Sequence, residues 1–219
     1  ATLLAQGVSM GLCYLYMYRH FEILRGTREE RRFQGALARH LANIGVPMGL
    51  QFSITAIGSI MLQGANNALG TVCVAAFTAA MRIKMFFICP FESLGIAMAT
   101  YCGQNYGAGK TRRIVQGIGA SGLMMAVYAA VTFVVLRFDA GELAMWFVDV
   151  SETEVIRNTE LFLHISSYFF PLLGTLCVLR YTIQGAGYTR LAMLSGVSEM
   201  FARALVSVYA VPVWGYLAI

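Results

Sequence analysis

The sequence has 219 residues, of which 58% are apolar and 12% are charged, with a net charge of +5 and a mean hydropathy of +0.65. Soluble globular domains carry about 25% charged residues, so this composition excludes a protein whose whole surface lies in water. It predicts an integral membrane protein.

Six segments are long and apolar enough to cross a bilayer, which takes about 20 residues in a helix. The sequence therefore predicts an all-α, polytopic membrane helix bundle. The first segment starts inside an apolar run with no signal-peptide pattern, and the last stops inside one, so we expect this sequence to be a piece of a longer chain. The segments are residues 1–18, 41–65, 71–102, 115–137, 161–184 and 191–219.

The connections between these segments alternate in charge. Residues 19–40 carry six arginines, the second connection carries no basic residue, and residues 138–160 carry six acids against Arg157 alone. Basic connections face the cytoplasm, so we expect residues 19–40 and the connections at Lys110 and Arg190 to be cytoplasmic, and residues 138–160 to be external. This topology accounts for the positive net charge, and we expect no nucleic-acid partner.

The second apolar segment carries polar side chains at intervals of four residues, which keeps neighbours on one slowly rotating helix face. One interpretation is hydrogen bonding between helices. The other is the wall of an aqueous or substrate cavity, and the sequence leaves both open. The strip consists of Gln51, Thr55, Ser59 and Gln63 and ends at Asn66 and Asn67.

The third segment holds three ionisable residues, Arg82, Lys84 and Glu92. Such residues cost at least about 2.5 kcal/mol each at the bilayer centre, so they usually face a partner or a cavity. Pro90 lies among them and should kink or break the helix. A broken helix would free backbone carbonyls, as transporters use at midplane sites. The alternative is a structural ion pair.

The stretch GQNYGAGKTRR, residues 103–113, ends in Gly-Lys-Thr as phosphate-binding loops do. Such a loop has four residues between its first glycine and the Gly-Lys pair, and it follows a short buried strand. Here five residues separate Gly103 from Gly109, after a long apolar segment, so we predict no nucleotide site. We expect a cytoplasmic turn that glycine permits and that basic residues anchor at the anionic leaflet. These anchors are Lys110, Arg112 and Arg113.

Two further pairs of polar residues lie in the last two segments. Arg180 and Gln184 are one turn apart near the cytoplasmic end of the fifth segment, where they either line a cavity or extend toward the membrane surface. Glu199 and Arg203 are one turn apart in the sixth segment and can neutralise each other within one helix. The alternative for the second pair is a role in binding a cation or substrate.

Cysteine and histidine indicate neither a disulfide framework nor a metal site. The three histidines are far apart in the sequence and no Cys-x-x-Cys pair occurs, so we expect free thiols buried as small apolar groups. We expect His164 and Tyr168, one turn apart in the fifth segment, to have a packing role. The cysteines are Cys13, Cys73, Cys89, Cys102 and Cys177.

Five patches in chain order resemble the multidrug and toxic compound extrusion (MATE) family of efflux transporters. They are IGVPMGLQFS, NNALGTVCVAAFTAAMRI, GIAMATYCGQNYGAGKTRR, LRYTIQGAGY and GVSEMFARA. Family members have twelve spans in two lobes of six. The resemblance implies that residues 1–18 are the sixth span, residues 19–40 the inter-lobe loop, and residues 41–219 spans seven to eleven of the C-terminal lobe. The N-terminal lobe and the last span would be missing.

The resemblance implies an exporter of organic cations or drugs that works by alternating access, is driven by inward H⁺ or Na⁺, needs no cofactor or metal, and crosses the cell membrane many times. In some branches acids on the seventh and tenth spans couple the ion. The equivalent segments here, residues 41–65 and 161–184, carry no acid, and Glu160 lies just before the second. Coupling therefore rests on the missing lobe, or on Glu92 or on Glu199 with its neighbour Arg203. The residues expected to line the cavity are Gln51, Thr55, Ser59, Gln63, Asn66, Asn67, Arg82, Arg180 and Gln184.

Two alternatives to a drug exporter remain. A lipid-linked oligosaccharide or polysaccharide flippase of the same superfamily would be favoured by a larger and more cationic central cavity. A membrane-embedded enzyme would need a nucleophile–base or metal constellation, and the sequence has no His-Glu-x-x-His and no Gly-x-Ser-x-Gly motif. We therefore expect that the protein is not an enzyme.

Overall fold

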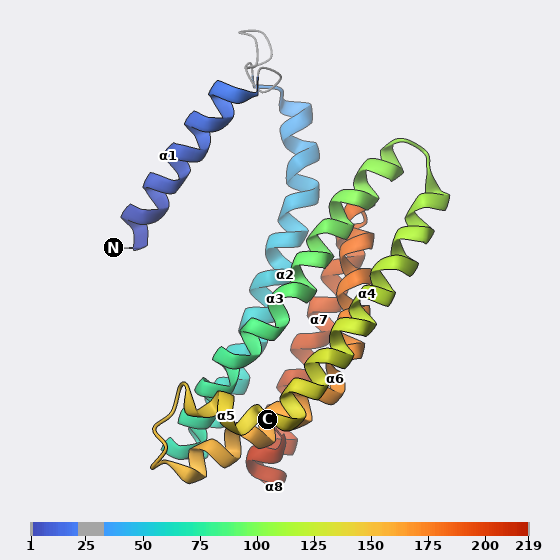
Figure 1. Cartoon of the computed structure of the whole chain (residues 1–219). Helices are drawn as coiled ribbons and strands as arrows, with labels where there is room; N and C mark the ends of the chain where they lie inside the picture. Colours follow the sequence, from blue (N-terminus) through green and yellow to red (C-terminus); the bar gives the residue numbers. More distant parts are fainter. Residues whose placement is uncertain (1, 22–32, 219) are drawn as a thin grey trace. The chain divides into compact units, whose positions relative to one another are not determined.

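The computed structural model describes residues 2–21 and 33–218, and every regular element in these residues is a helix (Figure 1). The predicted all-α fold class is confirmed. The long helices are α1 (Thr2–His20), α2 (Gly35–Asn67), α3 (Thr71–Gly107), α4 (Thr111–Phe138), α6 (Thr153–Gly185) and α7 (Thr189–Leu205). The short helix α5 (Ala140–Met145) joins α4 to α6, and η2 (Val206–Ala210), α8 (Val211–Trp214) and η3 (Gly215–Ala218) follow α7.

The chain divides into two compact units, residues 1–42 and residues 43–219. The first holds α1 and the start of α2. Half of the predicted inter-lobe loop, residues 22–32, lies outside the described residues. The second unit holds the rest of the chain, including every polar residue that the sequence places inside a membrane segment from Gln51 onward.

Five helical stretches in the described part of the chain are long and apolar enough to cross a membrane. These are α2, α3, α4, α6 and the stretch Thr189–Ala218. The predicted first span forms a helix, α1, but it is not among the five, because the tyrosines and Arg19 in its second half lower its hydropathy. Its crossing of the membrane stays a prediction.

The helices are longer than the apolar segments that predict them. Helix α6 starts at Thr153 instead of residue 161, and α3 ends at Gly107 instead of residue 102. A 33-residue helix such as α6 is about 50 Å long, whereas the hydrocarbon core of a bilayer is about 30 Å thick. Hydropathy marks only the part in lipid, and the backbone hydrogen bonds continue into the polar layers on either side.

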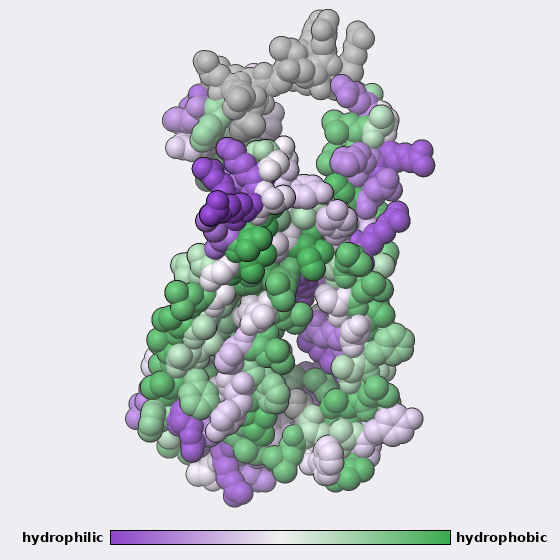
Figure 2. Space-filling view, turned by 90° about the vertical axis from the view of Figure 1, so that its right-hand side faces the viewer, coloured by the Kyte–Doolittle hydropathy of each residue, from purple (hydrophilic) through white to green (hydrophobic). Residues whose placement is uncertain are grey.

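The core of the second unit lies among α3, α4 and α6. Helix α3 packs most extensively against α6, and α4 packs against both. The Phe91 ring of α3 is buried with its centroid 5.0 Å from the ring of Tyr128 in α4 and 5.8 Å from that of Phe170 in α6. Large apolar side chains such as Leu123 and Leu172 are exposed on the outside, and the face of the bundle in Figure 2 is mostly hydrophobic. This surface suits contact with lipid.

Glycine allows α3 and α6 to approach closely at one end. Gly185 lies against the backbone of Ala99, and a Cβ on Gly103 would be 3.2 Å from the Gly185 carbonyl oxygen. Gly103 therefore belongs to a helix contact, not to the turn that the sequence predicts at residues 103–113. The chain reverses at residues 108–110, where Gly109 has a φ of +69°. The predicted reversal is present but shorter.

Helix α3 continues through Pro90 without interruption, so of the two expected outcomes the break is wrong, and the kink stays a prediction. Proline removes one backbone donor and leaves the carbonyl one turn earlier without its usual partner. Beside this position, the hydroxyl of Tyr128 in α4 donates to the carbonyl oxygen of Phe87 at 3.2 Å. The carbonyl that Pro90 frees is that of Phe86, so the Tyr128 bond does not replace the lost one; it ties α3 to α4 beside the proline.

Candidate functional site: a polar network between helices

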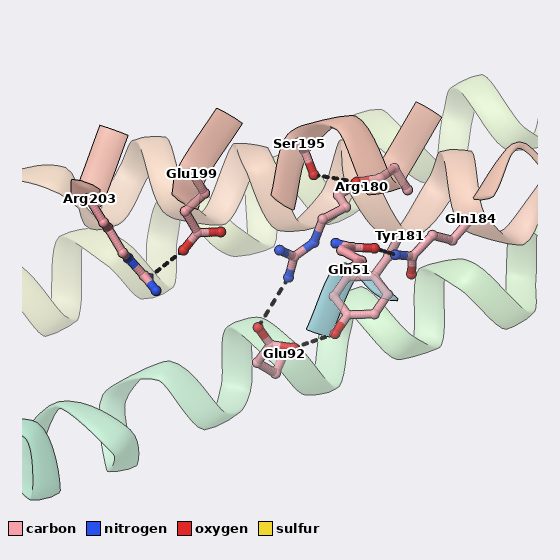
Figure 3. A network of polar contacts seen from close by, with 9 residues as sticks. Gln51, Glu92, Arg180, Tyr181, Gln184, Ser195, Glu199 and Arg203 are labelled. Atoms are coloured by element: carbon pink, nitrogen blue, oxygen red, sulfur yellow. Dashed lines mark hydrogen bonds and ion pairs between the residues drawn. The ribbon is translucent and has the colours of Figure 1, made fainter. Parts of the chain in front are cut away.

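A carboxylate on α3 meets two side chains of α6 in the middle of the bundle (Figure 3). The Glu92 Oε1 atom lies 3.5 Å from the Arg180 Nη2 atom, and the Tyr181 hydroxyl donates to the other carboxylate oxygen. Arg180 also lies over the Tyr181 ring, 5.3 Å from its centroid. Glu92 thus joins α3 to α6 through one ion pair and one hydrogen bond.

A second ion pair lies on α7 and reaches α2. Arg203 donates to the carboxylate of Glu199, one turn earlier on the same helix, as the spacing predicts. The same guanidinium also donates to the Thr55 carbonyl oxygen at 3.1 Å and to the Ser59 hydroxyl at 2.6 Å. Arg203 therefore binds two members of the polar strip of α2, and three of its contacts fix its position.

The first residue of the strip is buried. Gln51 is 2% exposed, and its Oε1 atom accepts a hydrogen bond of 2.8 Å from Nε2 of Gln184, which is 7% exposed (Figure 3). This contact joins α2 to α6. The structure thus places Gln51 and Gln184 in an interhelical hydrogen bond, and their expected role in lining a cavity stays a prediction.

Small residues let α2 and α7 approach each other beside these polar contacts. A Cβ on Gly196 would lie 2.9 Å from the Gln51 Cγ atom, and one on Gly58 would lie 3.1 Å from the Met200 Cα atom. Small residues at such crossings are typical of helix pairs in membranes, where polar side chains then bond across the contact.

The end of α2 holds the last three members of the strip. Gln63 donates from Nε2 to the Asn67 Oδ1 atom at 3.0 Å. Asn66 is fully buried, and within the described chain neither atom of its side-chain amide has a hydrogen-bond partner. Buried side-chain amides without a hydrogen-bond partner are rare in folded proteins.

A cavity of about 560 Å³ opens between α2, α3, α6 and the end of α7. In the space-filling view, hydrophilic atoms are recessed between apolar ridges of the bundle (Figure 2). The cavity contains three of the predicted site residues, Ser59, Gln63 and Arg82, together with Arg203 of the possible coupling pair. Its other lining residues are Leu62, Phe77, Thr78, Met81, Lys84, Met85, Phe162, Ala202, Val206 and Ala218.

The ionisable residues that lie close together in the sequence of α3 are not the ones that pair in the structure. Arg82 and Lys84 lie near Glu92 along α3, but Glu92 pairs with Arg180 instead. No sequence pattern indicates Tyr181 as a partner of Glu92, because a tyrosine in an apolar segment is ordinary. The His164 Nδ1 atom lies 3.4 Å from the Arg137 Nη1 atom, and its Nε2 atom lies 3.8 Å from the Glu160 Oε1 atom. The surroundings of His164 are therefore more polar than we expect for a residue with a packing role.

The basic anchors lie apart from this network. Lys110, Arg112 and Arg113 are exposed around the turn between α3 and α4. The Tyr101 hydroxyl donates to the Arg113 carbonyl oxygen at 3.1 Å and ties the start of α4 to α3. Among the described residues, no group of three or more histidine, cysteine or acidic side chains could hold a metal ion.

Comparison with known proteins agrees with this arrangement of membrane helices. The family model MatE matches residues 44–209. The chain belongs to the MatE family. It is 26% identical over 191 residues to the probable multidrug resistance protein YpnP of Bacillus subtilis (strain 168), and 21% identical over 190 residues to the probable multidrug resistance protein YoeA of the same organism.

These alignments cover 85% of this chain and 41% of each relative. The chain thus spans less than half the length of these two MatE relatives. The matched region contains α3, α4, α5, α6 and α7 in full and α2 from residue 44 onward, and with them every residue of the polar network. The family resemblance that the five sequence patches indicate is confirmed, and the chain is a multi-pass membrane protein.

Proposed function

We propose that the chain forms the C-terminal lobe of a secondary active multidrug exporter in the cell membrane, which works by alternating access and exchanges its substrate for H⁺ or Na⁺. Membership of the MatE family and the names of the two relatives support this. The observation that carries it is the Glu92–Arg180 ion pair, which joins two packed helices at a position where a cation can compete for the carboxylate.

Ion binding at Glu92 would change a contact between helices. A proton or Na⁺ on this carboxylate neutralises it, so that it no longer holds the Arg180 guanidinium. Arg180 is then an unpaired charge in a membrane segment, which is costly, and it favours a conformation in which water or substrate reaches it. In this way ion entry and helix rearrangement are linked. Glu199, paired with Arg203, offers the same chemistry between α7 and α2.

The size of the cavity favours a drug-sized substrate over a lipid-linked oligosaccharide. Pockets for drug-sized ligands measure about 300–1,000 Å³, and the cavity here measures about 560 Å³. The basic residues that line it are the feature expected of a flippase, so that function is the second candidate. Proton- or Na⁺-driven export of a soluble drug would decide for the first.

The test is uphill transport by the intact transporter in proteoliposomes. Accumulation of a fluorescent drug should follow an imposed pH or Na⁺ gradient and stop when that gradient is collapsed. Glu92→Gln should lower gradient-driven export about tenfold or more, because it removes a charged hydrogen-bonded contact. The control is Glu142→Gln, a change at an exposed residue of α5. Export that ignores both gradients would overturn the proposal.

A further inference from the structure

We propose that the cavity between α2, α3, α6 and α7 binds the acidic headgroup of an anionic amphiphile, meaning a carboxylate, sulfonate or phosphate joined to an apolar tail. The proposal that such a compound is also exported rests on the transporter function proposed above. The substrates inferred here are anions, whereas the family resemblance implies organic cations.

The charges that line the cavity carry this inference. Three cationic side chains line it, Arg82, Lys84 and Arg203, and no acid does. Glu199 is the partner of Arg203. Among the described residues, neither Arg82 nor Lys84 forms an ion pair with an acid. The cavity therefore has an excess of positive charge, which attracts an anion and repels a cation.

The rest of the lining suits an apolar tail beside that headgroup. The Phe77 and Phe162 rings and the Met81 and Met85 thioethers provide the largest apolar surfaces. Methionine side chains adapt to tails of different shape. The Lys84 ammonium lies over the Phe162 ring, 5.1 Å from its centroid. Charge and aromatic surface are thus adjacent, as an amphiphile requires.

Neutral polar side chains complete the polar side. Ser59, Gln63 and Thr78 line the same cavity. The Ser59 and Thr78 hydroxyls donate to backbone carbonyl oxygens of their own helices, whereas the Gln63 amide has a second hydrogen beyond its bond to Asn67. Arg203 is held in place by the Thr55 carbonyl oxygen and the Ser59 hydroxyl. Binding an oxyanion there requires little reordering of this side chain, and less ordering on binding leaves more free energy for affinity.

Arg82 also opens onto a second cavity. This space of about 580 Å³ is lined by Thr71, Glu152 and Phe147, among others, and it shares Thr78 and Arg82 with the first. Arg82 lies 11 residues after the start of α3, or about 16 Å along the helix. The two cavities therefore adjoin at Arg82, and the second cavity lies beside the α5–α6 connection.

The test is equilibrium binding to the intact transporter in nanodiscs of zwitterionic phosphatidylcholine. The probes are a dansyl-labelled undecanoate and a dansyl-labelled undecyl trimethylammonium, which differ in headgroup charge. We expect the undecanoate to bind at least about tenfold more tightly, and the double variant Arg82→Gln/Lys84→Gln to remove that preference. Equal or tighter binding of the ammonium probe, or unchanged undecanoate binding in the double variant, would overturn the inference.

Two variants control for folding and for surface charge. Arg82→Lys keeps the charge and should retain most of the preference for the anion. Arg157→Gln removes an exposed charge at the start of α6 that lines neither cavity and should change nothing. A loss of binding in Arg157→Gln equal to that in the double variant would show a general surface effect and overturn the inference.

Two sources could supply the anion, and a competition experiment separates them. Added phosphatidylglycerol should displace the undecanoate if a lipid headgroup is the occupant, and should leave it bound if a soluble organic anion is the occupant.

A transport measurement distinguishes this inference from the exporter proposal. Gradient-driven export of the ammonium without the undecanoate would overturn the inference alone, whereas export of neither would count against the exporter and leave the binding result to decide the site.

Discussion

Gln51 and Gln63 lie on the same helix in different surroundings. Gln51 is buried and accepts a hydrogen bond from Gln184 on α6, whereas Gln63 lines the basic cavity and bonds only to its neighbour Asn67 among the described residues. Replacing either one with leucine removes the same amide group. The two substitutions therefore separate a packing role from a transport role.

We expect Gln51→Leu to lower the melting temperature and Gln63→Leu to lower export. In the first variant Gln184, whose Oε1 atom already lacks a partner, loses its bond to Gln51, at a cost of about 1 kcal/mol. In the second, a donor is lost from the cavity, and export should fall several-fold. Thermal unfolding in detergent and drug export, measured on both, check this. Unchanged export with a lowered melting temperature in Gln63→Leu would contradict it.

Helix geometry explains why the sequence alone left this strip ambiguous. Residues four apart are offset by about 40° around a helix, so Gln51 and Gln63 point about 120° apart. The strip contacts α6 at Gln51 and reaches the cavity at Ser59 and Gln63, so the four-residue spacing alone could not assign its members to one role. By contrast, the Glu199–Arg203 pair lies within one turn and was predictable. The Glu92–Arg180 pair joins residues far apart in the chain, and no local pattern indicates it.

The crossing of α2 and α7 depends on Gly196. A Cβ there would lie 2.9 Å from the Gln51 Cγ atom and 3.3 Å from the Thr55 Oγ1 atom. We expect Gly196→Ala to separate the helices slightly and destabilise the protein by about 1–3 kcal/mol, as overpacking usually does. The control is Gly119→Ala in α4, where a Cβ would meet no atom within 4 Å.

The measurement is the melting temperature of both glycine variants in the same detergent. Gly119→Ala should equal or slightly exceed the wild type, because alanine favours a helix more than glycine. Equal melting temperatures for both variants would contradict the prediction, because they would show that α2 and α7 accommodate the added methyl group without loss of stability. Export should also fall in Gly196→Ala, because the added methyl group displaces the strip of α2 from Arg203.

Hydropathy located the five stretches that are long and apolar enough to span a membrane, but it placed most of their ends a few residues inside the helices. It reports which residues prefer lipid, whereas a helix ends where its backbone hydrogen bonds end. Pro90 shows the same limitation: the sequence contains the proline, but α3 continues through it while packed against α4 and tied there by the Tyr128 hydroxyl. An element's ends and continuity depend on neighbours that the local sequence does not name.

For the molecule as a whole, the predicted topology places the α3–α4 turn and the α5–α6 connection on opposite sides of the membrane. Single cysteines at Arg112 and Glu152, both exposed, should react with a membrane-impermeant maleimide from the inside and the outside respectively. The background should lack the five native cysteines. Labelling of both positions from the same side would refute the alternating topology on which the cytoplasmic assignments depend.

The buried residues of α2 in the described structure are two amides and a glycine: Gln51, Asn66 and Gly58. Helix α3, by contrast, buries aromatic and aliphatic groups against α4 and α6. Sliding α2 along α7 exchanges hydrogen bonds for equivalent ones with water and opens no apolar void, whereas sliding α3 would open one. In mechanical terms, α3, α4 and α6 form a stiff frame and α2 a compliant edge. We therefore expect displacements within the bundle to occur first along the helix that carries the polar strip.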